Sequence, residues 1–273
     1  MSEMLKCPVC QLPLAQDERT FVCQQGHSFD LAKEGYLNLL LNAKPTAGDS
    51  KEMMAARRNF LATGYYQPLS DAVNQVLFEA NQKKQAQSIL DIGCGEGYYL
   101  SRFQNLNAEA MAYFGMDISK LGIRMAAKKN KNIQWLVGNF AHLPFQNRSI
   151  DLILSMFAEY SVAEMTRILA DDGSIVIVRA GNQHLMELKQ IIYPEIHEKA
   201  KAEVIKPFPD FNVDRRQVTF TTKIRSNEDL MSLLLMTPHY WKIKPEGLEN
   251  LKNYQTLTVT VNIEIDLLTR QND

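Results

Sequence analysis

The sequence predicts an α/β fold, in which helices connect the strands of a mainly parallel sheet, preceded by a small metal-binding module. Between residues 88 and 179, short apolar runs alternate with segments of helical periodicity. A glycine-rich loop follows the first of these runs, and three cysteines and a histidine lie together near the N-terminus. We therefore expect a metal module over residues 1–36, a linker with helices over 37–79 and the main domain over 80–273.

The composition fits a protein without a membrane segment or a strongly basic surface. The chain has 273 residues, of which 45% are hydrophobic, enough for a full α/β core and a small appendage. Its formal net charge is -1, so an RNA partner must be held by local basic clusters. No apolar run approaches the roughly 18 residues of a membrane span, and the N-terminus has no signal-peptide pattern. We expect a cytoplasmic protein.

The N-terminal module has the spacing of a zinc site, Cys7-x2-Cys10-x12-Cys23-x3-His27. Two tight turns each present two ligands, and the spacer lets the two pairs face one another as a tetrahedron. Four protein ligands leave no open position, so the zinc would be structural, and so small a module needs a metal to fold. The alternative is a chance cluster of reduced thiols, since disulfides are disfavoured in a chain without an export signal.

Two helices are expected between the module and the main domain. Residues 29–41 should dock the module, and residues 43–49 form a linker. Asp49 and Glu52 have the spacing of a capping box, which would begin a helix that runs to Ala62. Pro68 suits the first turn of a second helix, which is expected to run through Glu79.

The glycine-rich loop after the strand at 89–92 is the centre of the predicted site. Its glycines follow the pattern G-x-G-x-G and are Gly93, Gly95 and Gly97. The dinucleotide-binding fingerprint is G-x-G-x-x-G, and it directs a helix at pyrophosphate. Asp91 in the strand and Glu96 in the loop suit a positively charged ligand instead, such as S-adenosylmethionine with its sulfonium and ammonium groups. The alternative is a tight turn without a ligand.

Two further strand ends are predicted to contact the nucleoside part of this ligand. Asp117 ends the strand at 112–117, where a carboxylate accepts hydrogen bonds from both ribose hydroxyls. Its alternative role is to cap the next helix, for which Ser119 is better placed. Asn139 and Phe140 follow the strand at 133–137 and would meet the edge and the face of the adenine, unless they form an ordinary turn.

The rest of the chain completes the sheet. A strand is expected at 149–158, a helix to 169, a turn at 171–173 and a strand at 174–179. A long helix at 183–206, a loop at 208–212, a strand at 218–224 and a helix opened by Ser226 follow. Strict alternation at 256–267 predicts an antiparallel strand beside the sheet edge. A seven-stranded sheet with a reversed last strand is the arrangement of Rossmann-like methyltransferases.

Several separated blocks of the sequence point to one family. They are Cys-Pro-x-Cys (7–10), Phe-Asp-x-Ala-Lys-Glu-Gly-Tyr-x-Asn-Leu (29–39), Met-Met-x-Ala-Arg-Arg-x-Phe-Leu (53–61), Tyr-Gln-Pro-Leu (66–69), Leu-Asp-Ile-Gly-Cys-Gly-Glu-Gly-Tyr-Tyr (90–99), His-Leu-Met-Glu-Leu-Lys (184–189) and Met-Thr-Pro (236–238). Over nearly the whole chain, these blocks resemble the bacterial 23S ribosomal RNA guanine-N1 methyltransferases. The zinc finger and the Lys-Glu-Gly-Tyr block make the resemblance specific.

The resemblance implies an S-adenosylmethionine-dependent enzyme that methylates N1 of a guanine in a hairpin loop of 23S rRNA, namely guanine 745. It also implies that the zinc module helps to select the RNA and that the protein is a homodimer. By position, Gly95, Glu96, Tyr66 and His184 would contact the cofactor. The alternative for Tyr66 is an aromatic residue of the core, and for His184 a helix residue facing water.

The segment after the fourth strand departs from the family, which tends to have Ala-Pro-Cys where this chain reads Phe-Ala-Glu-Tyr at 157–160. The methyl acceptor is expected at this segment. N1 of guanine must lose a proton, and Glu159 is the candidate acceptor, with a solvated acid as the alternative. Phe157, Tyr160 and Trp241 are candidates to stack on the base, or else are core residues.

Basic clusters at 57–58, 128–131 and 215–216 are the candidate phosphate contacts, or else ordinary solvated residues. Two other functions remain open. One is a methyltransferase that acts on a small molecule or a protein, and the other is a non-catalytic protein that binds S-adenosylmethionine or RNA. A dehydrogenase is the most distant alternative, because the glycine spacing is not that of a dinucleotide site.

Overall fold

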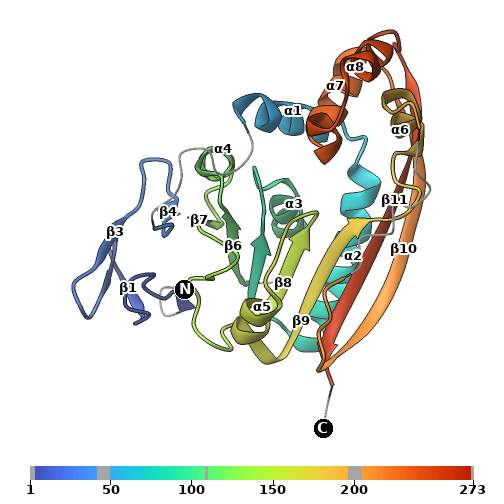
Figure 1. The fold of residues 1–273 in the computed structure, drawn as a ribbon. Coiled ribbons are helices and arrows are strands. Elements are labelled where there is room, and N and C mark those ends of the chain that lie inside the picture. Colours follow the sequence, from blue (N-terminus) through green and yellow to red (C-terminus); the bar gives the residue numbers. More distant parts are fainter. Residues whose placement is uncertain (1–3, 42–49, 108–109, 196–204, 272–273) are drawn as a thin grey trace.

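The main body of the protein is an eight-stranded mixed sheet with helices packed on it (Figure 1). The computed structural model describes residues 4–41, 50–107, 110–195 and 205–271. The strand order is β10-β11-β9-β8-β5-β6-β7-β4. The strands are β4 (Leu37–Asn38), β5 (Ser88–Ile92), β6 (Ala112–Asp117), β7 (Gln134–Val137), β8 (Ile150–Met156), β9 (Leu169–Ala180), β10 (Phe211–Ile224) and β11 (Leu257–Arg270).

The strand β5 lies in the middle of the parallel part of this sheet, between β6 and β8. Asp91 is in register with Gly115 on one side and Leu154 on the other. All five residues of β5 are buried, as expected for a strand covered on both faces. The strand β11 is antiparallel to both β9 and β10. This confirms the predicted α/β class with a reversed last strand, and the short strand β4 is an addition at the opposite edge.

The helices lie on both faces of the sheet and at the carboxyl ends of its parallel strands. They are α1 (Lys51–Ala62), α2 (Gln67–Lys84), α3 (Tyr98–Leu106), α4 (Lys120–Lys129), α5 (Val162–Ile168), α6 (Met186–Ile192), α7 (Asn227–Leu235), the 3-10 turn η2 (Pro238–Trp241) and α8 (Pro245–Lys252). At the carboxyl ends, α1 packs against α7, and α7 packs against η2 and α8 (Figure 1). Within the part of the chain that the structure describes, no helix has the length and apolar character to span a membrane.

The N-terminal module is a three-stranded antiparallel sheet of β1 (Leu14–Asp17), β2 (Thr20–Cys23) and β3 (Ser28–Asp30). Leu5 and Phe21 belong to the same buried cluster as Phe145 of the main domain. The residues that follow add β4 to the sheet beside β7, and Arg124 forms an ion pair with Glu34 at 2.7 Å. The predicted docking role of residues 29–41 is therefore confirmed.

Several predicted element boundaries are wrong. The cap of α1 is Ser50, whose hydroxyl accepts from the Met53 N–H at 3.2 Å; the linker and Asp49 lie outside the described residues. The helix α2 continues to Lys84, so the domain boundary predicted at residue 79 falls inside it. The strand β10 begins at Phe211 rather than 218, because it pairs with β11 along its whole length.

The largest error is the long helix expected at 183–206. The helix α6 ends at Ile192, and Tyr193 has an extended backbone. Pro194 follows, and the residue before a proline is disfavoured in the helical region. Residues 196–204 lie outside the described part of the chain. The turn expected at 171–173 lies within β9, where the pairing register with β8 shifts between Ile150 and Leu152.

Candidate active site

The four predicted zinc ligands form one cluster in the N-terminal module. The ligand atoms of Cys7, Cys10, Cys23 and His27 all lie within 4.8 Å of one another. The shortest separations are 3.3 Å from Cys23 Sγ to His27 Nδ1 and 3.5 Å from Cys10 Sγ to Cys23 Sγ. A tetrahedral zinc ion with Zn–S bonds of about 2.3 Å separates its ligand atoms by roughly 3.8 Å, so the cluster fits a closed structural site.

Two tight turns bring these ligands together. The Gln11 N–H donates to the Cys7 carbonyl at 2.9 Å, and the Gly26 N–H donates to the Cys23 carbonyl at the same distance. Gly26 has a φ of +81°, a conformation that favours glycine. Each turn thus presents two ligands, as the spacing predicts.

A cavity of about 680 Å³ opens at the carboxyl ends of β5, β6 and β8, beneath α1 and beside η2. This volume is in the range of small-ligand sites, and the carboxyl ends of parallel strands are where open α/β sheets bind ligands. Nearly all the residues predicted for the site line it: Tyr66, Asp91, Gly93, Gly95, Glu96, Asp117, Phe140, Glu159 and His184. The fold therefore brings together residues from six separated parts of the sequence.

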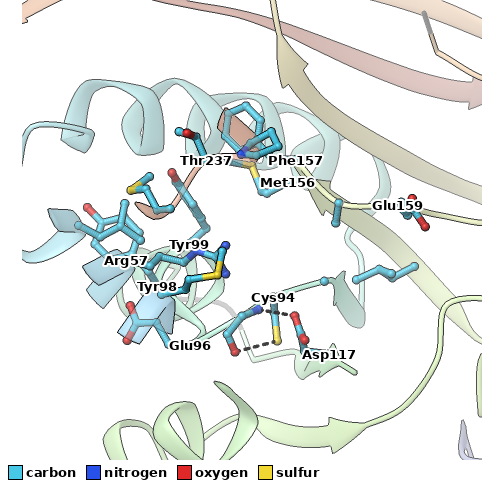
Figure 2. A pocket seen from close by; sticks show the side chains of 18 of the residues that line it. Arg57, Cys94, Glu96, Tyr98, Tyr99, Asp117, Met156, Phe157, Glu159 and Thr237 are labelled. Carbon is cyan, nitrogen blue, oxygen red and sulfur yellow. Dashed lines mark hydrogen bonds between the residues drawn. The ribbon is translucent and has the colours of Figure 1, made fainter. Parts of the chain in front are cut away.

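The glycine-rich loop is shaped by close contacts and by one carboxylate. Gly93 has a φ of +75°, and a Cβ there would lie 2.3 Å from the Cβ of Ala158. Asp117 accepts from the Gly95 N–H at 2.8 Å (Figure 2). It also accepts from the Ser119 N–H at 2.7 Å. Ser119 is the cap of α4, as expected. An ionised carboxylate has about four acceptor positions, so Asp117 can brace this loop and still accept from a ribose.

Three buried polar atoms in this cavity have no hydrogen-bond partner within the described part of the chain. They are Asp91 Oδ1, Glu96 Oε1 and Tyr66 Oη. Burial and the nearby Asp117 raise the pKa of Asp91 to about 8. Burial also raises the pKa of Glu96, although Lys129 at 3.8 Å opposes the shift. Unpaired buried polar atoms cost about 1–3 kcal/mol each. A ligand with an ammonium group would pair with these carboxylates, so the cavity fits S-adenosylmethionine.

His184 is buried against aromatic rings at the other side of the cavity. Its side chain is 8% exposed, which rules out a helix residue facing water. The ring is stacked on Phe157 at 6.2 Å, and its Nδ1 accepts from the Asn262 N–H at 3.3 Å. Burial and Lys189 lower the pKa of His184 to about 3, so the imidazole is neutral and Nε2 carries its proton. Tyr66 lines the cavity and also packs on the core, so the expected core role is confirmed and the cofactor contact stays a prediction.

The segment at 157–160 divides between the cavity and the core. Phe157 is 44% exposed, lines the cavity and has a φ of +50°, which is rare for a residue with a side chain. Glu159 is exposed and lies at the opposite side of the cavity from Arg57 and Glu96 (Figure 2). Tyr160 is buried against Phe208 and is a core residue, not a stacking platform.

Asn139 is the one predicted cofactor contact that does not line the cavity. Its side-chain oxygen accepts from the Ala141 N–H at 2.9 Å. This bond supports the alternative interpretation, in which Asn139 belongs to an ordinary turn at the strand end. The neighbouring residues Gly138 and Phe140 do line the cavity. A short polar side chain that folds back on its own turn is a common end for a strand.

Two segments that enclose the cavity were predicted from the sequence only in part, since Trp241 was a candidate to stack on the base but its neighbours and α1 were not placed at the site. The helix α1 contributes Arg57, which was considered only as an RNA contact, and the segment with η2 contributes residues 236–239 and Trp241. Both segments carry blocks typical of the family, at 53–61 and 236–238, and these blocks were the available signal. The basic cluster at 215–216, a candidate phosphate contact, forms ion pairs within the protein. Arg215 pairs with Asp266 at 2.6 Å, and Arg216 pairs with Glu79 at 2.6 Å.

This fold and this cavity define an S-adenosylmethionine-dependent methyltransferase with an N-terminal zinc ribbon. Residues 5–44 match the family described as RlmA, N-terminal, and residues 89–173 match the methyltransferase domain family. YxjB of Bacillus subtilis, assigned as a 23S rRNA (guanine-N1)-methyltransferase, is 30% identical over 269 residues, which cover 96% of this chain and 95% of YxjB. The 23S rRNA (guanine(748)-N1)-methyltransferase of Streptomyces fradiae is 30% identical over 249 residues, covering 89% of this chain and 88% of that protein. The chain belongs to the family of 23S rRNA (guanine-N1)-methyltransferases.

Proposed function

We propose that the protein transfers a methyl group from S-adenosylmethionine to N1 of a guanine in a hairpin loop of 23S rRNA. The observation that carries this proposal is the 30% identity to YxjB across 96% of the chain, which includes both the ribbon and the cavity. A methyltransferase domain alone would leave the acceptor undefined. The shared ribbon supports an RNA acceptor, and we propose that it helps to select the hairpin.

The chemistry requires two groups held in line and one proton removed. When bound, S-adenosylmethionine supplies a methyl group activated by its sulfonium. N1 of guanine forms the new bond to the methyl carbon as the carbon–sulfur bond breaks, and N1 gives up its proton. Asp91, Glu96 and Asp117 would hold the cofactor at the glycine-rich loop, so that positioning supplies much of the rate.

Glu159 is the proposed proton acceptor. It is the carboxylate of the cavity that lies apart from the glycine-rich loop, and its exposed side chain leaves it free to meet a base that enters from solvent (Figure 2). General bases contribute about 10²- to 10⁴-fold to rates. Glu159→Gln should therefore lower kcat by at least about 10²-fold at unchanged cofactor affinity. A loss below about threefold would make Glu159 a solvated acid, since a true general base contributes far more.

The acceptor can be mapped directly. Purified protein, labelled S-adenosylmethionine and 23S rRNA from a strain that lacks this gene should give labelled RNA and one new primer-extension stop, since a methyl on N1 blocks base pairing. The resemblance implies guanine 745, whereas the S. fradiae relative is named for guanine 748, and the stop decides between them. Label in metabolites or proteins but not in RNA would replace this proposal with the alternative acceptor.

We further propose that the protein is a homodimer. Sedimentation of the full chain tests this oligomeric state.

A further inference from the structure

The cavity has two sides with different chemistry. The side at the glycine-rich loop carries the buried carboxylates Asp91 and Glu96. The side formed by the end of β8, the start of α6 and the η2 segment carries aromatic and basic groups, among them Phe157, Lys189 and Trp241. In Figure 2, Phe157 and Thr237 are both drawn away from Glu96. The first side suits a cation, and the second suits a flat, electron-rich group.

Two exposed aromatic side chains face the second side. Among the large apolar side chains that the structure describes as exposed, three are aromatic: Phe157 at 44%, Trp241 at 69% and Tyr254 at 41%. Two of these three line the same cavity. Aromatic rings left in water beside a ligand cavity are typical of sites where a nucleobase stacks.

The backbone that carries Trp241 is held in place although its ring is exposed. The Thr237 hydroxyl donates to the Leu234 carbonyl at 2.8 Å, and the Lys242 N–H donates to the His239 carbonyl at 3.0 Å. The Tyr193 hydroxyl is hydrogen-bonded to His239 Nδ1 at 2.9 Å, which ties this turn to the end of α6. A ring presented on an anchored turn loses little freedom when a ligand stacks on it.

The charges on this side favour a guanine that is losing its N1 proton. Burial and Lys189 lower the pKa of His184 to about 3 and that of His239 to about 4, so both imidazoles are neutral at pH 7. Lys189 lines the same side and is the basic group that lowers the pKa of both imidazoles, although burial also lowers its own pKa. Guanine without its N1 proton carries negative charge on O6, and a nearby cation stabilises that form.

We propose that Trp241 stacks on the methyl-acceptor guanine, which lies in the part of the cavity bounded by Phe157 and Lys189. This inference rests on the proposed function, because it assumes an RNA acceptor. The base leaves its loop to reach the cofactor, and the indole replaces part of the stacking that it loses.

Tryptophan fluorescence tests this stacking, because the chain has two tryptophans and the other, Trp135, is 1% exposed. The probe is a synthetic hairpin that contains the guanine mapped as methylated, compared with the same hairpin abasic at that position. The guanine hairpin should quench the emission, the abasic hairpin should bind with little quenching, and Trp241→Phe should abolish the response. Equal quenching by both hairpins, or none by a hairpin that is methylated, would overturn the proposal.

Kinetics give the second readout. Trp241→Ala should lower kcat/KM for the hairpin by about 5- to 100-fold, whereas Trp241→Phe should keep most of the activity. Cofactor affinity by calorimetry should be unchanged, and Tyr254→Ala is the control for loss of an exposed ring elsewhere. If Trp241→Ala has the same kcat/KM for the hairpin as the wild type, the stacking role of Trp241 is wrong but the proposed function stands. If the wild type methylates no RNA, the proposed function is wrong whatever the variant does.

Discussion

The zinc ribbon and the cofactor cavity are built in opposite ways. The ribbon takes its four ligands from residues 7–27, and their donor atoms already lie within 4.8 Å of one another, so the set is closed. The cavity takes its lining from Met53 to Trp241 and leaves buried polar atoms of Tyr66, Asp91 and Glu96 without partners among the described residues. Four ligands from one short segment with no open coordination position indicate a structural metal site. A cavity that is lined by many elements and has unpaired buried polar atoms indicates a ligand-binding site.

The largest effect should follow from breaking the ribbon. Cys23→Ser should lose the zinc ion and the amide protection of residues 5–30, because a structural zinc contributes about 10–16 kcal/mol to folding in zinc-finger peptides. Elemental analysis and hydrogen exchange measure the two losses. Cofactor affinity should stay within about twofold, since distant sites behave independently.

Cys94→Ser is the matched control, because Cys94 lies in the cavity and outside the zinc cluster. This variant should keep one zinc ion per chain. If Cys23→Ser also kept its zinc, the cluster would not be the metal site.

A smaller effect is expected at the centre of the cavity. Asp91→Asn should weaken S-adenosylmethionine binding by about 10- to 100-fold, because it removes a charge-assisted contact. With its pKa raised to about 8, Asp91 is mostly protonated at pH 7, and a bound ammonium favours the carboxylate. Wild-type binding should therefore release a proton. Calorimetry in two buffers of different ionisation enthalpy measures this release, which should vanish in the variant; equal release in both proteins would assign it to another group.

The same carboxyl group sets a pH dependence of stability. The pKa of Asp91 is raised from 3.8 to about 8 by burial and Asp117, so its contribution to folding is full below pH 3.8 and is lost as the pH rises through 8. Denaturant unfolding of the ligand-free protein between pH 4 and 8 should show a decline that Asp91→Asn lacks.

The smallest effect concerns the strained backbone of the acceptor side. Phe157 has a φ of +50°, so Phe157→Gly should be more stable than Phe157→Ala by about 0.5–1 kcal/mol, after allowing for the extra chain entropy of glycine. Both variants lose the ring stacked on His184, and the comparison isolates the backbone. Urea unfolding measures the difference. An alanine variant as stable as the glycine variant would show that this conformation carries no strain.

The ribbon and the glycine-rich loop could be predicted because their chemistry is local. Spacing alone predicted that Cys7 and His27 belong to one metal cluster. An acid in a strand followed by alternating glycines predicted that Asp91 and Gly93 line one ligand cavity. The cap of α4 at Ser119 also followed from its position at a helix start. Each of these relations is confined to a few residues or to one βα unit.

The rest depends on contacts that no short stretch of sequence encodes. Trp241 and Arg57 line the cavity because α7 and α1 pack together over the sheet, which periodicity does not predict. Tyr160 turns to the core because Phe208, almost fifty positions away, packs against it. The error at the end of α6 is different in kind, since Pro194 was a local signal for the end of a helix.

The central claim is that the cavity above the glycine-rich loop takes S-adenosylmethionine. Calorimetry on the zinc-loaded full chain, with S-adenosylmethionine and NAD titrated in parallel, tests it most directly. We predict one S-adenosylmethionine bound per chain and no heat from NAD. Binding of NAD without binding of S-adenosylmethionine would contradict the claim and every residue role derived from it.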